Sequence, residues 1–445
     1  MDIASLYEEK RCTPEEAVRL VQSGDWVDYG QACSFPPDLD AALAARRDEL
    51  TDVKVRNAIS MRPIQIVEQD PQQQAFTYNV WHCSGVDRKY IDEGRAFFSP
   101  MMFRFCGSYY RRGQAPVDVA MITVSPMDRY GNFSYSLTNC CTQEILDVAK
   151  HIIVEVNEGA PFVYGMADDH INIRNVDAVV ESTQPMCTVS SRGASALDKQ
   201  IAAQIFPFIH DGDTLQLGIG GMPNALGTLI AESDLKDLGM HTELMSDGYL
   251  DLYKAGKITN KRKSLQQGKG VFSVCNGSQE LYDFLDHNID ILSAPIHYVN
   301  DPETIRQLDH FVSINGCIAC DLYGQVSSES AGTRQISGTG GQLDFVTGAY
   351  TAEHGRTFLA MASSRIDKKG VRHSNIVPYF TGGDIITTPR AQTMYIVTEY
   401  GAVNLAGLTT WQRAEKLIGI AHPDFREDLI KAAEAQHIWR RSHKR

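Results

Sequence analysis

Short apolar runs alternate with helix-like segments along this chain. Over residues 13–22, the sequence T-P-E-E-A-V-R-L-V-Q predicts a helix, because Thr13 suits the N-cap, Pro14 suits the first helical position and acidic residues follow. The pattern continues as a turn and strand over 23–30, a helix over 37–50 and a strand over 53–59. Alternating strands and helices favour an α/β fold with open, mainly parallel sheets.

The chain also repeats itself. The helix, turn and strand at 13–30 recur at 197–218, D-R-Y-G-N-F-S at 128–134 recurs as D-L-Y-G-Q-V-S at 321–327, and I-I-V-E at 152–155 recurs within Y-I-V-T-E at 395–399. The order is kept, and the offset grows from 193 (321 − 128) to 244 (399 − 155). We therefore expect two tandem related α/β domains, residues 1–190 and 191–445, with an insertion in the second. The Ser/Thr/Gly/Pro-rich segment Ser182 to Ser195 marks the boundary.

One stretch carries the strongest chemical signal. A strand over Thr214 to Leu217 is followed by a glycine turn, Gly218 to Gly221, and by a helix predicted over Pro223 to Leu238. Glycines allow a ligand to approach the backbone, and free N–H groups at a helix start favour anions or oxyanions. Glu243, in the next apolar segment, would meet this turn if both strands end at one edge of a parallel sheet. That arrangement suits acyl chemistry.

The plainer interpretations of this stretch are glycines that serve tight packing and a solvated or salt-bridged Glu243. The repeat helps to choose between them. The first pair of repeated segments, 13–30 and 197–218, is offset by 188 residues (212 − 24). At that offset Glu243 aligns with Val55, and Gly218 to Gly221 aligns with Gly30-Gln-Ala-Cys33. The first copy thus lacks both the carboxylate and the glycine turn, so the second copy is predicted to hold the reactive group.

A second glycine-rich stretch spans 328–345, where Gly338, Gly340 and Gly341 offer backbone N–H groups for an oxyanion or phosphate. A plain surface loop is its alternative interpretation, and Gly382-Gly383 is predicted to be a simple turn. Glu399, in an apolar run, is either a buried carboxylate with a shifted pKa or a paired structural one. Asn300 is predicted to be a turn residue before Pro302.

Several familiar sites are missing from the sequence. The glycines at 218–221 do not complete G-x-G-x-x-G, because the third glycine would fall on Pro223. The sequence contains no G-x-x-x-x-G-K-[ST] and no G-x-S-x-G. Nicotinamide, flavin and P-loop sites and a serine-hydrolase nucleophile are therefore not predicted.

Composition sets further bounds. The 445 residues are 43% hydrophobic and 22% charged, which is typical of a globular protein of two or three domains. A formal charge of −13 argues against nucleic acid as the main partner. The first residues lack an apolar signal core, and the sequence has no run that would span a bilayer, so we expect a cytoplasmic or organelle-matrix location.

The cysteines and histidines do not predict a metal site. Of the ten cysteines, Cys140 and Cys141 are adjacent, and Cys317 and Cys320 form the single C-x-x-C. We interpret Ile314 to Cys320 as one buried apolar strand in which cysteines act as small hydrophobic residues. The 13 histidines are scattered and no H-E-x-x-H occurs.

At these residues the chain resembles the family I coenzyme A transferases, in the butyryl-CoA:acetate and 4-hydroxybutyrate branch of the acetyl-CoA hydrolase/transferase family. The similar motifs run through nearly the whole sequence: S-G-D-W-V-D-Y-G at 23–30, L-Q-L-G-I-G-G-M-P-N-A at 215–225, H-T-E at 241–243, A-G-K-I-T-N at 255–260, Q-I-S-G-T-G-G-Q-L-D-F at 335–345, V-T-E-Y-G at 397–401 and A-H-P-D-F-R at 421–426. The family fold has two open α/β domains per chain, as the repeat predicts.

The resemblance implies roles for individual residues. Glu243 would be the nucleophile in the second domain, with oxyanion-hole N–H groups from Ile219 and Gly341, and Asn300 and Glu399 would lie beside it. Coenzyme A (CoA) would contact these groups and further positions carried over from the family, namely Gly220, Gly221, Met222, Pro223, Ile318, Gly338 and Gly340. The resemblance also implies acyl-CoA and a carboxylic acid as substrates, no metal or prosthetic group, and a homo-oligomer, most simply a dimer.

The motifs leave the substrate pair open among acetate, butyrate, 4-hydroxybutyrate and dicarboxylates such as itaconate or succinate. Residues Arg62 to Met101 and Arg104 to Arg112 are where we expect the acyl pocket, since a basic side chain there would favour dicarboxylates. An acyl-CoA hydrolase and a non-catalytic CoA-binding protein are the competing hypotheses.

Overall fold

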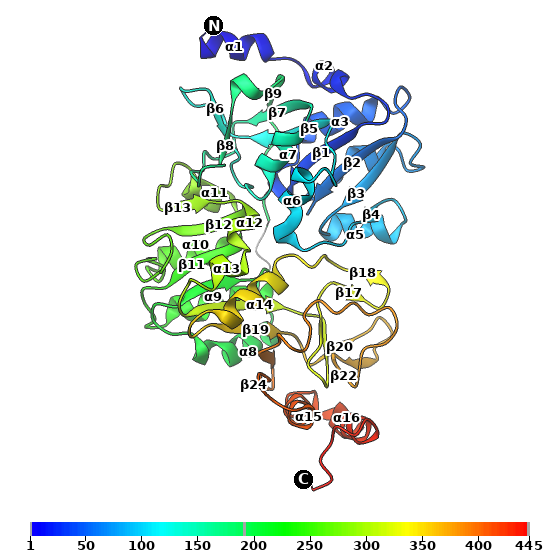
Figure 1. The fold of residues 1–445 in the computed structure, drawn as a ribbon, viewed down its shortest axis with the longest axis vertical. Coiled ribbons are helices and arrows are strands. Elements are labelled where there is room, and N and C mark those ends of the chain that lie inside the picture. Colours follow the sequence, from blue (N-terminus) through cyan, green and yellow to red (C-terminus); the bar gives the residue numbers. More distant parts are fainter. Residues whose placement is uncertain (1, 190–192, 443–445) are drawn as a thin grey trace. The chain divides into compact units, whose positions relative to one another are not determined.

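The computed structural model describes residues 2–189 and 193–442 (Figure 1), so the predicted boundary between 190 and 191 lies outside the described residues. By its internal contacts the chain divides into two compact units. The first unit comprises Met1–Ser190, Glu243–Asp247 and Gly270–Asn300, and the second comprises Ser191–Thr242, Gly248–Lys269 and Asp301–Arg445. Glu243 is thus grouped with the N-terminal part of the chain.

The first unit is built on a parallel sheet of seven strands in the order β4-β3-β2-β1-β5-β7-β9. The chain order reverses between β1 and β5, which makes their carboxyl ends the usual place for a ligand in such a sheet. The strands are β1 (Trp26–Gln31), β2 (Val53–Ala58), β3 (Phe76–Val80), β4 (Phe97–Phe98), β5 (Val119–Val124), β7 (His151–Asn157) and β9 (Ala178–Ser182).

Both faces of this sheet are buried. Along β5, Val119 and Met121 belong to one apolar core and Ala120, Ile122 and Val124 belong to another, because successive side chains point to opposite faces. The first core includes residues of α2 and α3, and the second includes residues of α6 and α7 (Figure 1). The helices of this unit are α1 (Ile3–Lys10), α2 (Pro14–Ala17), α3 (Pro37–Ala45), α4 (Gln65–Glu68), α5 (Gly85–Asp92), α6 (Cys106–Arg111), α7 (Thr142–Val148), α11 (Gln279–Leu285) and α12 (Ile296–Val299).

Smaller elements complete the first unit. Strand β6 (Asn132–Ser134) pairs with β8 (His170–Asn172), and β12 (Gly270–Cys275) pairs in parallel with β13 (Ile291–Ser293). Single bridges tie Cys140 to Pro295 and Gly165 to Ser293, so the late segment is joined to the loops of the N-terminal part.

The second large sheet has eight strands, of which β12 and β13 have just been described. The others follow the order β11-β10-β14-β19-β23-β24, with all neighbours parallel except β23 and β24. These strands are β10 (Thr214–Leu217), β11 (Gly239–Met245), β14 (Phe311–Gly316), β19 (Arg356–Ala360), β23 (Tyr395–Thr398) and β24 (Gly401–Asn404). The predicted class, α/β with two mainly parallel sheets, is confirmed.

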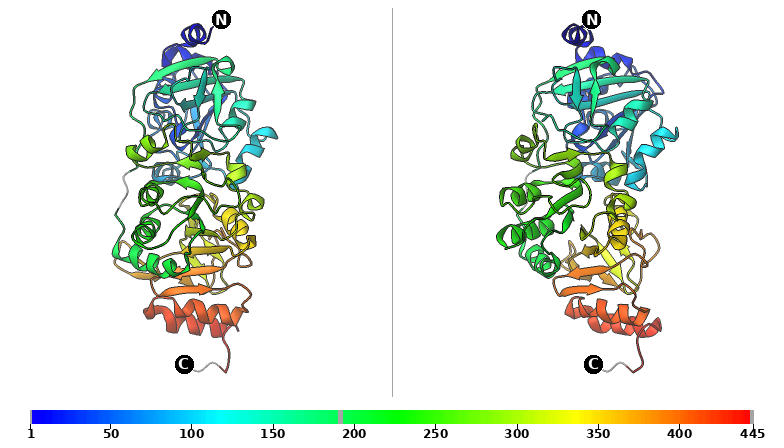
Figure 2. Two further views of the ribbon diagram at one scale, coloured as in Figure 1. Left: turned by 90° about the vertical axis from the view of Figure 1, so that its left-hand side faces the viewer. Right: turned by 60° about the vertical axis from the view of Figure 1, so that its left-hand side comes forward.

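The helices of the second unit are α8 (Ala196–Ile205), α9 (Gly221–Glu232), α10 (Asp247–Lys254), α13 (Pro302–Ile305), α14 (Gln342–Thr351), α15 (Thr410–Gly419) and α16 (Pro423–Ala435). Helices α15 and α16 pack side by side (Figure 2). Leu417 and Leu429 belong to the same apolar core. The short strands are β15 (Ala319–Asp321), β16 (Val326–Ser327), β17 (Ser330–Ala331), β18 (Arg334–Gln335), β20 (Ser364–Ile366), β21 (Arg372–Ser374) and β22 (Ile376–Val377). No helix in the described part of the chain is both long and apolar enough to cross a membrane.

Two of the predicted repeats are confirmed by geometry. Thr13 caps α2 with a capping box, and β1 and β10 hold the same central place in their sheets. Asp128 accepts from the backbone N–H groups of residues 130 and 132, and Asp321 accepts in the same way from 323 and 325. Gly131 and Gly324 have φ angles of 87° and 88°, which L-residues rarely adopt, so the two turns need glycine at the same point.

The third repeat is wrong as aligned. Counted outward from the equivalent central strands β1 and β10, β7 in the first sheet corresponds to β19 in the second. Residues 395–398 form β23, which corresponds to β9. The register also corrects the position that matches Glu243. In the first sheet Trp26 of β1 pairs with Lys54, and in the second sheet Thr214 of β10 pairs with Gly239, so Lys54 and Gly239 hold equivalent positions. Glu243 is four residues after Gly239 and therefore matches Ala58, four residues after Lys54, rather than Val55. The first sheet still has no carboxylate there.

Some predicted element bounds are also corrected. Helix α9 begins at Gly221 and ends at Glu232, short of Leu238, because Ser233 accepts from the N–H of Leu235 and turns the chain. Helix α3 ends at Ala45 rather than residue 50. The predicted strand from 314 to 320 is two strands, β14 and β15, with a break at residues 317–318.

Candidate active site

Glu243 and Asn300 lie side by side in the first unit. Glu243 stands on β11 and is partly buried, and Asn300 is fully buried at the end of α12. The side-chain Nδ2 of Asn300 donates a hydrogen bond to Oε2 of Glu243 over 2.5 Å. A donor this close to a carboxylate fixes its orientation. Asn300 is the turn residue that the sequence predicts, and it lies beside Glu243, where the family resemblance places it.

Backbone hydrogen bonds hold Asn300 in place. Its N–H donates to the carbonyl of Ile296, and the N–H of Ile296 donates to the carbonyl of Cys140 over 2.7 Å. The side-chain Oδ1 of Asn300 is buried and accepts no hydrogen bond from the described residues. Leaving a buried acceptor unpaired costs about 1–3 kcal/mol. A ligand that donates to this oxygen would recover that cost.

Three buried thiols lie close to this pair. The sulfur atoms of Cys106, Cys140 and Cys141 are all within 4.8 Å of one another, and the charge of Glu243 acts on Cys140. Gln31, the last residue of β1, spans two of them: its Oε1 accepts from Cys140 Sγ over 2.8 Å, and its Nε2 donates to Cys141 Sγ over 3.1 Å. Burial raises the pKa of Cys140 and Cys141 well above that of a free thiol. Burial also opposes ionisation of Cys106, but hydrogen bonding with the neighbouring thiols outweighs it and lowers the pKa of that group.

A buried glutamate flanks the thiols. Glu144 is 1% exposed, and its Oε1 lies 2.7 Å from Nη2 of Arg111 and 3.0 Å from Nδ1 of His297. Arg111 and His297 are themselves about half exposed, at 48% and 40% of their side chains, so they connect this carboxylate to solvent. A Cβ on Gly107 would come within 2.5 Å of Glu144, so only glycine leaves room for the carboxylate here.

In the second unit, the predicted glycine turn follows β10. The N–H of Gly218 donates to the carbonyl of Ile314, and Gly220 has a φ of +119°, which favours glycine. Ile219 is 68% exposed at the tip of this turn. Helix α9 begins directly after it, with Pro223 in the first turn, where its missing N–H costs nothing. Met222 is buried.

The second glycine stretch is not a plain surface loop. Gly338, Gly340 and Gly341 are all buried, and Gly340 has a φ of +54°. Glu329 organises the segment, because its carboxylate accepts from Thr339 Oγ1 over 3.2 Å. Gly341 is the N-cap of the ten-residue helix α14. The N–H groups at this helix start therefore follow a compact, ordered turn.

Glu399 and Ile318 also belong to the second unit. Glu399 follows β23 and is a paired carboxylate: its two oxygens accept from the N–H and the Oγ of Ser363, at 2.9 and 2.6 Å. Ile318 lies between β14 and β15, and its N–H donates to Ser327. Since β10, β14, β19 and β23 are parallel, Glu399 and the glycine turn follow the carboxyl ends of strands in one sheet. Residues 382–383 form the simple turn that was predicted.

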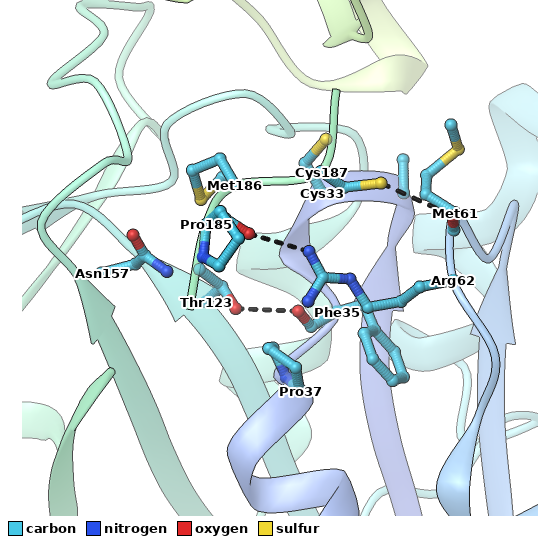
Figure 3. Close-up of a pocket in the computed structure, with 11 residues that line it drawn as sticks. Cys33, Phe35, Pro37, Met61, Arg62, Thr123, Asn157, Pro185, Met186 and Cys187 are labelled. Atoms are coloured by element: carbon cyan, nitrogen blue, oxygen red, sulfur yellow. Dashed lines mark hydrogen bonds between the residues drawn. The ribbon is translucent and has the colours of Figure 1, made fainter. Parts of the chain in front are cut away.

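A small cavity lies at the carboxyl edge of the first sheet (Figure 3). Its polar side chains are already engaged. Arg62 donates to the carbonyl of Pro185 over 2.9 Å, and Thr123 donates to the carbonyl of Phe35 (Figure 3). Asn157 donates to residue 184 and accepts from residue 159. The remaining lining is mostly apolar or thiol: Ala32, Cys33, Phe35, Pro37, Met61, Pro185, Met186 and Cys187.

The cavity is connected to the strand that carries Glu243. Cys33 Sγ donates to Oδ1 of Asn276 over 3.1 Å, and the N–H of Asn276 donates to the carbonyl of Met245, two residues after Glu243. Arg62, at the start of the predicted acyl-pocket region, is the one residue of that region that lines the cavity.

Sequence reasoning missed Gln31, Cys106 and Glu144. One signal was present, because in the repeat Gln31 aligns with Ile219 of the glycine turn. Cys106 gave no signal, since it is far in sequence from the adjacent pair Cys140 and Cys141 and only the fold brings the three together.

Comparison with known proteins agrees with this architecture. Residues 1–190 match the acetyl-CoA hydrolase/transferase N-terminal domain, and residues 277–433 match the C-terminal domain of the same family. The chain is 46% identical to the butyryl-CoA:acetate CoA-transferase of Anaerostipes caccae, covering 100% of both chains. It is 37% identical to the 4-hydroxybutyrate coenzyme A transferase of Clostridium kluyveri, over 97% of this chain and 98% of that one. The crystal structure of RipA from Yersinia pestis superposes with a TM-score of 0.89 at 37% identity, covering 98% of this chain and 100% of RipA.

The fold and these matches define an enzyme of the CoA-transferase class. The chain belongs to the acetyl-CoA hydrolase/transferase family.

Proposed function

We propose that this protein transfers CoA between a short-chain acyl-CoA and a free carboxylic acid, with Glu243 as the nucleophile. The observation that carries the proposal is the short hydrogen bond from buried Asn300 to Glu243. It occurs in a chain that is similar over its full length to a butyryl-CoA:acetate CoA-transferase. An asparagine that orients a partly buried glutamate is what a carboxylate nucleophile requires.

The proposed reaction is a ping-pong exchange. The carboxylate of Glu243 attacks the carbonyl carbon of the acyl-CoA thioester, and the C–S bond breaks. CoA departs as the thiolate, and the acyl group remains on Glu243 as an acyl-glutamyl anhydride. The thiolate then attacks the glutamyl carbonyl of the anhydride, which releases the free acid and leaves a glutamyl-CoA thioester. An incoming carboxylate reverses both steps and departs as the new acyl-CoA. Each step exchanges one acyl bond for another, so the cycle consumes no oxidant, metal or prosthetic group.

Each attack produces a tetrahedral oxyanion that needs a hydrogen-bond donor. We assign these donors to the N–H groups of Ile219 and Gly341, which lie in the glycine-rich turns that precede α9 and α14. In other enzymes, removing one such donor costs about 2.7–4 kcal/mol of transition-state stabilisation. The buried Oδ1 of Asn300 is assigned to an N–H group of bound CoA, because that oxygen has no donor among the described residues.

Binding of the rest of CoA is assigned to the second unit. Three of the assigned groups follow or flank the carboxyl ends of its parallel strands, namely the turn over 219–223, Ile318 and Glu399. The glycines at 338 and 340 directly precede the start of α14. Contacts to parts of CoA that are remote from the sulfur would supply binding energy for the reacting centre.

We further propose that the acyl chain enters the cavity beside Cys33 and Met61. Thr123 and Asn157 are engaged within the chain, and Arg62 donates to Pro185 with one nitrogen of a guanidinium that carries five N–H donors. A short aliphatic chain such as that of butyrate fits an apolar lining better. Arg62 is the one cation among the described residues that line the cavity, so a dicarboxylate such as succinate or itaconate would have to place its second carboxylate there.

Intact-mass measurement tests the nucleophile. Wild-type protein mixed with butyryl-CoA should gain the mass of CoA as a glutamyl thioester, and borohydride should remove that adduct by reducing the thioester. Glu243→Gln should show no adduct, whereas Glu232→Gln, at an exposed position on α9, should react like wild type. If Glu243→Gln still forms the adduct, the assigned nucleophile is wrong.

The same preparation separates the competing functions. A hydrolase would consume butyryl-CoA equally fast with and without acetate, whereas a transferase should form acetyl-CoA only when acetate is added. A non-catalytic CoA-binding protein would retain CoA without forming an adduct. Assays of acyl-CoA against acceptor acid, with acetate, butyrate, 4-hydroxybutyrate, succinate and itaconate, would then rank the substrates.

A further inference from the structure

Cys106, Cys140 and Cys141 form a cluster that the proposed reaction does not use. Their sulfur atoms lie within 4.8 Å of one another, and all three side chains are fully buried in the first unit. Cys106 begins α6, and the other two immediately precede α7, so two packed helices bring the thiols together. The plain alternative is that they fill the core as small hydrophobic residues.

The spacing of the sulfurs fits a metal ion. A thiolate–zinc bond is about 2.3 Å long, so three thiolates around one zinc ion lie roughly 4 Å apart. The observed upper limit of 4.8 Å therefore requires less than an ångström of contraction. Soft sulfur ligands select thiophilic ions such as zinc and copper(I) over magnesium or calcium.

The surroundings of the cluster provide polar contacts of the kind that support metal ligands. The side chain of Gln31 already hydrogen-bonds to two of the sulfurs, which orients them. The carboxylate of Glu144 acts on Cys106 and adds negative charge, which favours a cation. Glu144 contacts the half-exposed side chains of Arg111 and His297, so one buried residue separates these surface groups from the thiol on which its charge acts.

We propose that Cys106, Cys140 and Cys141 bind one thiophilic d¹⁰ cation of the zinc class, and that the bound ion lowers transferase activity. On binding, each thiol loses its proton to solvent and its sulfur forms a bond to the metal. Cys140 then no longer has a proton to donate to Gln31, so that contact must rearrange. The carbonyl of Cys140 accepts from the N–H of Ile296, whose carbonyl accepts from the N–H of Asn300, so a change at Cys140 reaches the residue that orients the candidate nucleophile.

The sequence did not predict this metal site, because Cys140 and Cys141 form an adjacent pair without a local third ligand. The fold adds Cys106, which is 34 positions away from Cys140 (140 − 106). Neither Cys317 nor Cys320 belongs to a metal-compatible group among the described residues.

Cobalt(II) is a suitable probe, because thiolate ligands give it intense near-ultraviolet charge-transfer absorption. Metal-free protein, kept reduced and titrated with cobalt(II), should develop that absorption with an endpoint of one ion per chain, and zinc should displace it. Cys106→Ala and Cys141→Ala should each weaken binding at least tenfold. Cys83→Ala, which removes a buried thiol outside the cluster, should bind like wild type.

Two measurements on the wild type keep the test decisive if an alanine variant fails to fold. Binding of zinc in weak buffer should release two or three protons per ion, and cadmium NMR should report three sulfur ligands. Zinc should also slow CoA transfer in wild type and in Cys83→Ala but not in Cys141→Ala. The proposal is overturned if the wild type shows no thiolate absorption, or if folded Cys106→Ala and Cys141→Ala bind cobalt as tightly as wild type.

Discussion

Replacement of Asn300 tests the contact on which the proposed function rests. Asn300→Ala removes the hydrogen bond to Glu243, and a hydrogen bond to a charged group is worth about 1.5–3 kcal/mol. If that energy is expressed in the transition state, kcat/KM falls roughly 10- to 150-fold. Asn300→Asp keeps the size of the side chain but places a second carboxylate beside Glu243.

The aspartate variant should be the more severe of the two. Two unit charges about 4 Å apart repel by about 4 kcal/mol at an effective dielectric constant of 20, which corresponds to roughly a thousandfold loss in rate. Lowering the pH should restore part of the activity, because a protonated aspartic acid can again donate to Glu243. If Asn300 only filled space, Asn300→Asp should be more active than Asn300→Ala, because aspartate keeps the size of the side chain. A lower kcat/KM for Asn300→Asp that rises at low pH therefore indicates that Asn300 positions Glu243.

Transfer of CoA from butyryl-CoA to acetate, followed by chromatography of the thioesters at several pH values, measures both effects. Asn375→Asp is a matched control, because it adds the same charge at a buried asparagine whose Oδ1 already accepts from Arg365. It should stay within about twofold of wild type, as is usual for a change away from the site. A folded Asn300→Asp variant that is as active as wild type, or more active than Asn300→Ala, would refute the positioning role of Asn300.

Three further outcomes follow from the structure. Met61→Trp should fill the cavity beside Cys33 and reduce kcat/KM for butyryl-CoA about 10- to 200-fold relative to acetyl-CoA, measured by competing the two substrates. Gly220→Ala should lower the free energy of unfolding by about 1–3 kcal/mol in urea titrations, because its φ of +119° strains an L-residue, and should also slow transfer. Burial raises the pKa of Glu155 from 4.5 to about 8. The folded state therefore keeps a proton that the unfolded state has released, and stability falls by about 1.4 kcal/mol per pH unit between those values. Glu155→Gln should flatten this dependence, measured by urea titrations at pH 5 and 8.

Each of these outcomes has a clear control or contradiction. Gly419→Ala, in ordinary helical backbone with free space for a Cβ, should leave stability unchanged or slightly raised. An equal loss in Gly419→Ala and Gly220→Ala would exclude backbone strain as the cause. An unchanged ratio of butyryl-CoA to acetyl-CoA rates in Met61→Trp would remove the cavity from the acyl site. A Glu155→Gln variant with the wild-type pH dependence would show that another group carries it.

The sequence alone determined the local features of this protein. Thr13 and Pro14 predict the start of a helix, and glycines at 131 and 324 mark two equivalent turns, because capping and left-handed backbone depend on residues close together in the chain. The strand at 214–217 and the glycine turn after it were predicted for the same reason. The predicted end of α9 at Leu238 was wrong, because one side-chain hydrogen bond at Ser233 stops the helix early.

Only the tertiary structure decided which distant residues meet. The family resemblance implied that Asn300 lies beside Glu243, 57 positions away, but the hydrogen bond between them comes from the fold. Cys106 meets Cys140 and Cys141 through the packing of two helices. The order of strands in each sheet corrected the third repeat, because similar apolar strands do not reveal their neighbours in the sequence. Contacts of this kind depend on how whole elements pack, and the pattern of residues along the chain contains no information on their distances.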